Sequence, residues 1–150
     1  MGGSKMNNAP GKGMLKVVGI LFIIVGAIYT LLGILAFAGS FSQAVVEQTA
    51  AITGATATVI RVSALVMLIL GLFELVAGIL GVKNCNKPEK AQTCFIIGVV
   101  LVLLVVANAI MSVTKGQFVW YMTVIDLALP VLYLIGALKN KEVADKVTEK

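Results

Sequence analysis

The sequence predicts an all-α membrane protein, an antiparallel bundle of four transmembrane helices with both termini in the cytoplasm. Of its 150 residues, 59% are hydrophobic and only 13% are charged. Soluble domains have about 45–50% apolar and about 25% charged residues. The apolar residues also gather in four long runs, and each run can cross about 30 Å of hydrocarbon as a helix. Composition and run length together therefore predict four membrane spans.

The four runs define the predicted spans, which cover residues 14–38, 62–82, 93–114 and 118–138. Each is longer than about 18 mostly apolar residues, and backbone groups in lipid must pair within their own segment, so each run is predicted as an α-helix. The basic residues before the first run, and the pair Ala36 and Ala38 at its end, resemble a signal peptide with its cleavage site. The apolar run is longer than the about 7–15 residues of a signal peptide, which favours an uncleaved anchor.

The segments outside the spans are short. Residues 1–13 are rich in Gly, Asn and Lys and are predicted to be a disordered cytoplasmic N-terminus. Residues 39–60 carry apolar side chains at helical spacing, which predicts a short amphipathic helix on the outer side. The positions concerned are Phe41, Val45 and Ile52, with Gly54 at the end of the helix. Residues 139–150 form a charged cytoplasmic tail, predicted as a short or frayed helix. None of these segments is large enough for a second domain.

The distribution of basic residues predicts the orientation. Ten of the twelve Lys and Arg residues lie in the N-terminal segment, at the start of the first span (Lys16), in the 83–92 loop or in the tail, and only Arg61 and Lys115 lie in or beside the other two loops. Cytoplasmic segments carry the excess of Lys and Arg, so both termini and the 83–92 loop are predicted on the cytoplasmic side of the plasma membrane. Topology accounts for the basic residues, which leaves a nucleic-acid partner without support.

Small residues recur at seven-residue steps in the first two spans. Close packing of small residues replaces the hydrophobic drive that is missing between helices in lipid. A seven-residue stripe is typical of the left-handed, near-antiparallel crossing of a four-helix bundle. We therefore expect the first two spans to touch along the following residues: Gly19, Gly26, Gly33, Ala64, Gly71 and Gly78.

Two carboxyl groups stand inside the predicted spans. Glu74 lies between Gly71 and Gly78 on the small-residue stripe, and Asp126 lies on one stripe of the fourth span, so both are predicted to face inward. Pro130 follows Asp126 by four residues, frees its carbonyl group and predicts a kink. The other polar side chains of this candidate intramembrane site are Asn108, Tyr29 and Thr30.

Three interpretations of these carboxyl groups stay open. They can form hydrogen bonds between helices, handle a proton or a cation, or dock a partner subunit that carries basic residues. Catalysis is not predicted, because the chain has no histidine, no Cys-x-x-Cys motif and no nucleophile motif. Cys85 and Cys94 are expected to be free cytoplasmic thiols, and neither a metal site nor a cofactor is expected.

Two stretches resemble small four-span integral membrane proteins of bacteria whose roles are uncharacterised. They are "KVVGILFIIVGAIYTLLGIL" and "LILGLFELVAGILGVKNCNKPEKAQTC", and the resemblance covers residues 16–105. It implies the four-span architecture and a bacterial plasma membrane, and it carries over no functional residue.

The sequence thus predicts a non-enzymatic membrane protein, accessory to the envelope or partner-binding, in which Glu74 and Asp126 form hydrogen bonds between helices. Its expected partners are the lipid bilayer and either a second copy or other membrane proteins. The alternative is a small proton- or cation-coupled transporter or channel subunit that uses the same two carboxyl groups.

Overall fold

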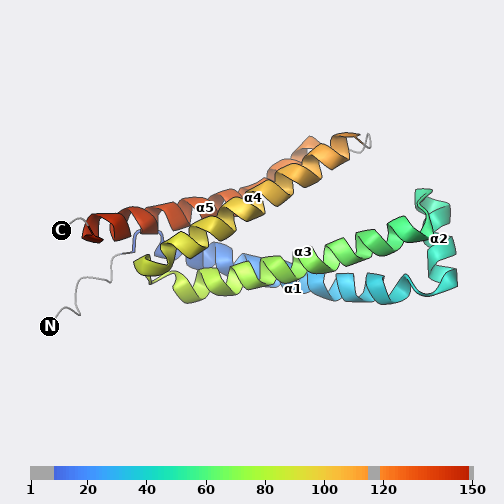
Figure 1. Ribbon diagram of the computed structural model, residues 1–150, viewed down its shortest axis with the longest axis horizontal. Coiled ribbons are helices and arrows are strands. Elements are labelled where there is room, and N and C mark those ends of the chain that lie inside the picture. The colour runs from blue at the N-terminus through green and yellow to red at the C-terminus, as the bar shows by residue number, and fades with distance from the viewer. Residues whose placement is uncertain (1–8, 115–118, 149–150) are drawn as a thin grey trace. The chain divides into compact units, whose positions relative to one another are not determined.

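The computed structural model describes residues 9–114 and 119–148. They form five α-helices and one short 3₁₀ turn, with no strand in the described ranges (Figure 1). The elements are α1 (Lys12–Gly39), α2 (Gln43–Thr53), α3 (Ala57–Asn84), η1 (Pro88–Lys90), α4 (Ala91–Thr114) and α5 (Trp120–Thr148). The predicted class, an all-α protein with four long apolar helices, is confirmed.

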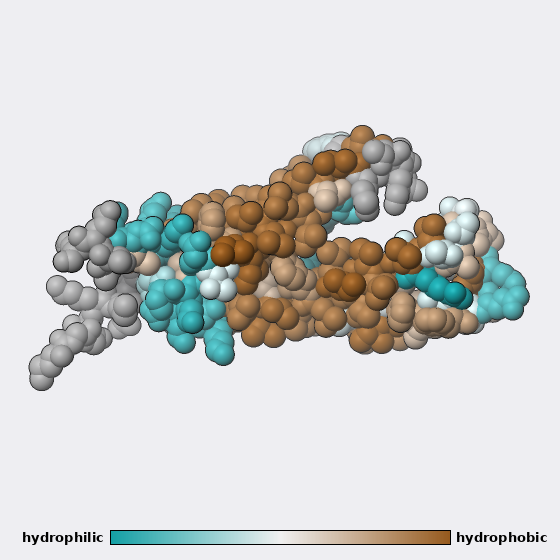
Figure 2. Space-filling view, viewed as in Figure 1, coloured by the Kyte–Doolittle hydropathy of each residue, from teal (hydrophilic) through white to brown (hydrophobic). Residues whose placement is uncertain are grey.

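Four of these helices, α1, α3, α4 and α5, are long and apolar enough to cross a membrane. Only 17–28% of each apolar stretch is buried inside the protein, and apolar residues cover the sides of these helices in Figure 2. A soluble monomer rarely exposes apolar patches larger than a few hundred Å². The surrounding solvent must therefore be apolar, and the chain is a multi-pass membrane protein.

The helices extend beyond the predicted spans. α3 begins at Ala57 rather than at residue 62, and α5 continues through Pro130 to Thr148. Residues 139–148 are helical, as predicted for the tail, but they continue α5 instead of forming a short helix of their own. The residues after 138 include no Gly or Pro that would break a helix, and Asn140 is fully buried. The short helix predicted in residues 39–60 is present as α2.

Most of the N-terminal segment predicted as disordered, residues 1–8, lies outside the described residues. For residues 9–13 the prediction is wrong. Ala9 is buried, the Lys12 amide donates a hydrogen bond to the Ala9 carbonyl at 2.9 Å, and α1 begins at Lys12. The segment is ordered because its backbone packs closely, which the absence of a side chain at Gly11 permits.

The chain divides into two compact units, which we describe separately. The first unit consists of Met1–Phe22 and Ala77–Lys150, and the second consists of Ile23–Val76. In the first unit, α4 and α5 pack side by side along their length (Figure 1). In the second unit, α1 and α3 run alongside each other and α2 lies across their direction (Figure 1).

Close contacts between α1 and α3 lie along the glycine stripe. In the second unit, a Cβ atom placed on Gly26 would lie 2.5 Å from the Leu75 nitrogen, and one on Gly33 would lie 2.7 Å from Leu68 Cα. In the first unit, a Cβ atom on Gly19 would lie 2.9 Å from the Gly78 oxygen. Any side chain at these positions would displace backbone atoms, so glycine is what lets the two helices approach this closely.

Candidate functional site

Glu74 belongs to the second unit and lies on α3. Its Oε2 atom is buried. One turn earlier, Gly71 packs against α1, and a Cβ atom there would lie 2.5 Å from the Thr30 nitrogen and 3.0 Å from Thr30 Oγ1. Thr30 Oγ1 is also buried, and it makes no hydrogen bond with any described residue. The structure thus places Thr30 against Gly71, one turn from Glu74, whereas the neighbouring Tyr29 side chain is 43% exposed.

Asn108 and Asp126 belong to the first unit, on α4 and α5. Both side chains are exposed, so the structure differs from the prediction that Asp126 faces inward. The α5 stripe on which Asp126 lies is buried only further along the helix, at Pro130, Tyr133 and Ala137. Helical spacing placed Asp126 on the right stripe but could not show whether another helix covers that stripe at its depth.

Asn108 and Asp126 lie at similar heights in the α4–α5 pair. Gly98 of α4 packs against Leu134 of α5, since a Cβ atom on Gly98 would lie 3.2 Å from Leu134 Cα. Asn108 lies ten residues after Gly98 along α4, and Asp126 lies eight residues before Leu134 along α5. At about 1.5 Å per residue, their heights differ by about 3 Å.

The best-defined polar arrangement in the first unit centres on Asn140, which is fully buried. Its Oδ1 accepts a hydrogen bond from the Gly11 amide at 2.8 Å, and its Nδ2 donates one to the Cys85 carbonyl at 3.1 Å. Asn140 therefore ties together the start of α1, the end of α3 and α5. A buried amide with both functions satisfied holds these three elements in one arrangement.

Two glycines make room for Asn140. A Cβ atom on Gly11 would overlap the Gly136 carbonyl oxygen, and one on Gly136 would lie 3.2 Å from the Leu15 nitrogen. Leu15 is itself fully buried. The backbones of α1 and α5 thus touch directly, which brings the Gly11 amide within reach of the Asn140 side chain.

Tyr133 extends this arrangement along α5. Its hydroxyl group donates a hydrogen bond to the Ala77 carbonyl at 3.0 Å, and its ring packs edge-on against Phe22 with a centroid distance of 5.7 Å. Gly81 leaves the space for the ring, since a Cβ atom there would lie 2.6 Å from Tyr133 Cε2. Cys94 is buried nearby on α4, and Cys85 and Cys94 are both free thiols. We call the group of Asn140, Gly11, Cys85, Tyr133 and Ala77 the Asn140 cluster.

The Asn140 cluster was missed at the sequence level, although a signal exists. Tyr133, Gly136, Ala137 and Asn140 follow one another at three- and four-residue spacing, which is typical of one helix face. The charged residues after position 138 are typical of a solvated tail, and a tail was predicted there instead.

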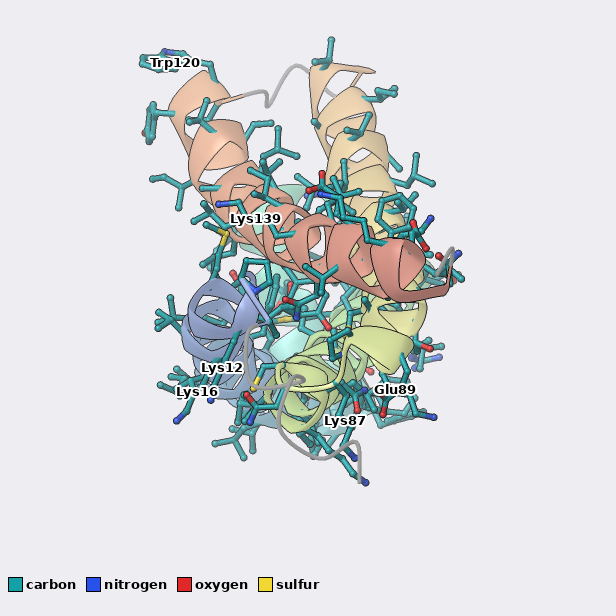
Figure 3. All side chains as sticks on the ribbon, turned by 90° about the vertical axis from the view of Figure 1, so that its left-hand side faces the viewer. Lys12, Lys16, Lys87, Glu89, Trp120 and Lys139 are labelled. Carbon is teal, nitrogen blue, oxygen red and sulfur yellow. The ribbon has the colours of Figure 1, made fainter. Side chains whose placement is uncertain are left out.

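Lysines surround the end of the first unit that holds the Asn140 cluster. They come from the start of α1, the α3–α4 connection and α5, and four of them are labelled in Figure 3. The lysines of this end, which we call the lysine end, are Lys12, Lys16, Lys83, Lys87, Lys90, Lys139, Lys141 and Lys146. One of them is held against an aromatic ring, since Lys141 Nζ lies 5.1 Å from the centre of the Phe95 ring. Among the described residues, no three His, Cys, Asp or Glu side chains are grouped so that they could hold a metal ion.

No protein-family model, curated protein or solved structure matches this chain. Its function must therefore be argued from its own residues. These residues offer a tightly hydrogen-bonded cluster at the lysine end, a buried carboxyl group on α3 and an exposed carboxyl group on α5.

Proposed function

We propose that this chain is a non-enzymatic membrane protein that binds another transmembrane helix through residues 120–129 of α5. The observation that carries the proposal is the exposed carboxyl group of Asp126 on a membrane span. Its neighbours Val124 and Ile125 are 59% and 62% exposed. The proposed partner is a span of a second copy or of another membrane protein that offers a hydrogen-bond donor or a basic side chain to Asp126.

The free energy of burying a carboxylate in lipid supports this proposal. Asp costs about 2.5–3.5 kcal/mol at the centre of a transmembrane helix, which is an upper bound for Asp126 near the end of its span, and such residues almost always face protein or a water-filled cavity. Asp126 is six residues from Trp120 at the start of α5, about 9 Å along the helix. The apolar stretch of α5 begins at Thr123, so Asp126 lies about 4.5 Å inside it, and contact with a partner helix would supply the polar partner that lipid lacks.

The backbone at Asp126 adds a second acceptor. Pro130 lies inside α5 and has no N–H group to donate to the Asp126 carbonyl four residues earlier. Asn108 lies at a similar height on α4 and is also exposed. A partner helix with donor groups would therefore meet several polar atoms at one depth.

The lysine end indicates how the protein is oriented. We infer that this end lies in the cytoplasm and that the protein resides in a bacterial plasma membrane with both termini inside. Ten of the twelve basic residues support this orientation. In that orientation, Asp126 and Asn108 lie in the outer half of the membrane.

Photocrosslinking in native membranes tests the partner-binding proposal. A photoreactive amino acid replaces Ile125, beside Asp126, and the matched control carries it at Ile28, which is 54% exposed on α1. We expect adducts between chains from position 125, at least fivefold more abundant than from position 28. The Asp126→Leu substitution should remove them, because it deletes the acceptor.

The same experiment can contradict the proposal in two ways. Adducts to lipid or within one chain only, from position 125, would exclude a partner at this surface. Adducts between chains that persist in the Asp126→Leu variant would show that a partner is present but does not recognise the carboxyl group.

A proton- or cation-coupled transporter is the second candidate, and the buried Oε2 atom of Glu74 favours it. Glu74 lies ten residues before the end of α3, about 15 Å from Asn84, and buried intramembrane acids often carry protons. Proton flux into vesicles containing the purified protein tests this candidate. Transport requires flux well above that of empty vesicles and its loss on Glu74→Gln substitution, whereas a partner-binding role predicts no flux.

A further inference from the structure

Helix α2 and the segment just before it carry apolar side chains that are largely exposed in the described part of the chain. None of its residues is buried. Val45 and Ile52 are 42% and 78% exposed, and Phe41, just before the helix, is 64% exposed. Val45 and Ile52 are seven residues apart and therefore lie on one stripe of the helix. We call Phe41, Val45 and Ile52 the apolar stripe of α2.

The other sides of α2 face different surroundings. Val46, Thr49 and Ala50 are half-buried. Glu47 is exposed and accepts a hydrogen bond from the Gln43 side chain at 2.9 Å. At 100° per residue, Glu47 lies about 140° around the helix from Ile52. Gln43 and Glu47 thus point in a clearly different direction from the apolar stripe, which one exposed polar residue, Gln48, interrupts about 40° from Ile52.

The connections on both sides of α2 hold it at the membrane boundary. Only three residues separate the end of α1 at Gly39 from the start of α2, and three separate its end at Thr53 from the start of α3. Three residues span at most about 10 Å. Since α1 and α3 cross the membrane, α2 can move only a short distance from the ends of the two spans.

Specific contacts fix the orientation of α2 at its first end. Arg61 of α3 donates a hydrogen bond from Nε to the carbonyl of the fully buried Ser40 at 3.2 Å. Its guanidinium group lies 5.4 Å from the centre of the Phe41 ring, and that ring packs edge-on against Phe37 of α1 at 5.2 Å. At the other end, Gly54 adopts a left-handed conformation with φ 68° and closes the helix.

We propose that α2 lies in the interface of the lipid bilayer with its apolar stripe inserted among the upper acyl chains. The stripe belongs to the same unit as exposed apolar residues of the adjoining spans, such as Leu35 at 61% and Val62 at 54%. Interfacial helices bury their apolar side about 5–10 Å into the boundary between headgroups and acyl chains. α2 itself has no Lys or Arg, and therefore its insertion does not require anionic lipid.

Tryptophan fluorescence of the full-length protein in phosphatidylcholine vesicles tests the proposal. The background variant is Trp120→Phe, which removes the one native tryptophan. A single tryptophan is then introduced by Ile52→Trp, on the stripe, or by Glu47→Trp, on the polar side. Both positions are exposed, so neither substitution disturbs packed side chains.

We expect lipids brominated near the top of the acyl chains to quench the Ile52→Trp variant at least threefold more than the Glu47→Trp variant. Acrylamide in the aqueous phase should show the opposite order. Equal quenching of both variants by acrylamide would overturn the proposal, because the stripe would then face water. Protection of the Ile52→Trp variant from both quenchers would also overturn it, because a protein would then cover the stripe.

Discussion

The two halves of the apolar part of α5, residues 120–129 and 130–140, are similarly apolar but are packed very differently. In residues 130–140, Tyr133, Ala137 and Asn140 are fully buried. In residues 120–129, Trp120, Val124 and Ile125 are all more than half exposed, and Asp126 is exposed too. Apolar character therefore does not decide which half of a membrane helix packs inside the protein.

Small residues and hydrogen bonds account for the difference. The 130–140 half has Gly136, which touches α1, and Asn140, whose side-chain oxygen and nitrogen both form hydrogen bonds. The 120–129 half has no glycine, and its carboxyl group is exposed. In lipid, association depends on close packing and on hydrogen bonds between helices. The 130–140 half finds its packing and hydrogen-bonding partners within the protein, whereas we propose that the 120–129 half finds them in a partner helix.

The strongest test of the packed half is Asn140→Ala. This change leaves the Gly11 amide and the Cys85 carbonyl without their side-chain partner, and a buried polar group that loses its partner costs about 1–3 kcal/mol. We expect the free energy of unfolding to fall by about 2–4 kcal/mol. Unfolding by SDS in mixed micelles measures it. Lys139→Ala is the control, because Lys139 is the exposed neighbour, and an equal loss in both variants would refute the role of the Asn140 cluster.

A matched pair of enlargements on the same helix tests the contrast directly. Gly136→Leu forces a side chain against the Leu15 backbone, and overpacking of this kind costs about 1–3 kcal/mol. Ala128→Leu introduces the same final side chain at an exposed position of the 120–129 half and should change the stability of the isolated protein by less than about 0.5 kcal/mol. Thermal unfolding in detergent compares the two variants. Similar destabilisation by both would mean that the halves are packed alike.

The smallest expected effect belongs to the hydroxyl group of Tyr133. Tyr133→Phe keeps the ring against Phe22 and removes only the hydrogen bond to the Ala77 carbonyl. Hydrogen bonds between membrane helices contribute about 0.6 kcal/mol on average, so a loss of this size is expected. Tyr121→Phe in the exposed half, where Tyr121 is 51% exposed, serves as the comparison and should have no effect on unfolding by SDS.

The sequence predicts the helices of this protein better than it predicts the contacts between them. Run length alone locates the four spans, since no other structure satisfies twenty consecutive backbone groups in lipid. The spacing of Phe41, Val45 and Ile52 likewise predicts α2, and Gly54 marks its end. These features are local, and each depends on residues within one segment.

The environment of Asp126 differs from the prediction, and no role was predicted for Asn140, because both depend on other segments of the chain. Periodicity assigns Asp126 to a stripe, but the burial of that stripe changes along α5 with what lies beside it. Asn140 lies among charged residues that are typical of a solvated tail, and its partners are 129 and 55 residues away in the sequence. No local pattern contains that information.

The most direct test compares Asp126→Leu with Asn140→Leu in the isolated protein, measuring the free energy of unfolding of each variant in micelles. Our account predicts that Asn140→Leu destabilises the protein by about 2 kcal/mol or more. Asp126→Leu should leave the stability unchanged within about 0.5 kcal/mol, because this carboxyl group serves a partner and not the fold. A comparable loss of stability in both variants would contradict the account and would make Asp126 part of the protein's own packing.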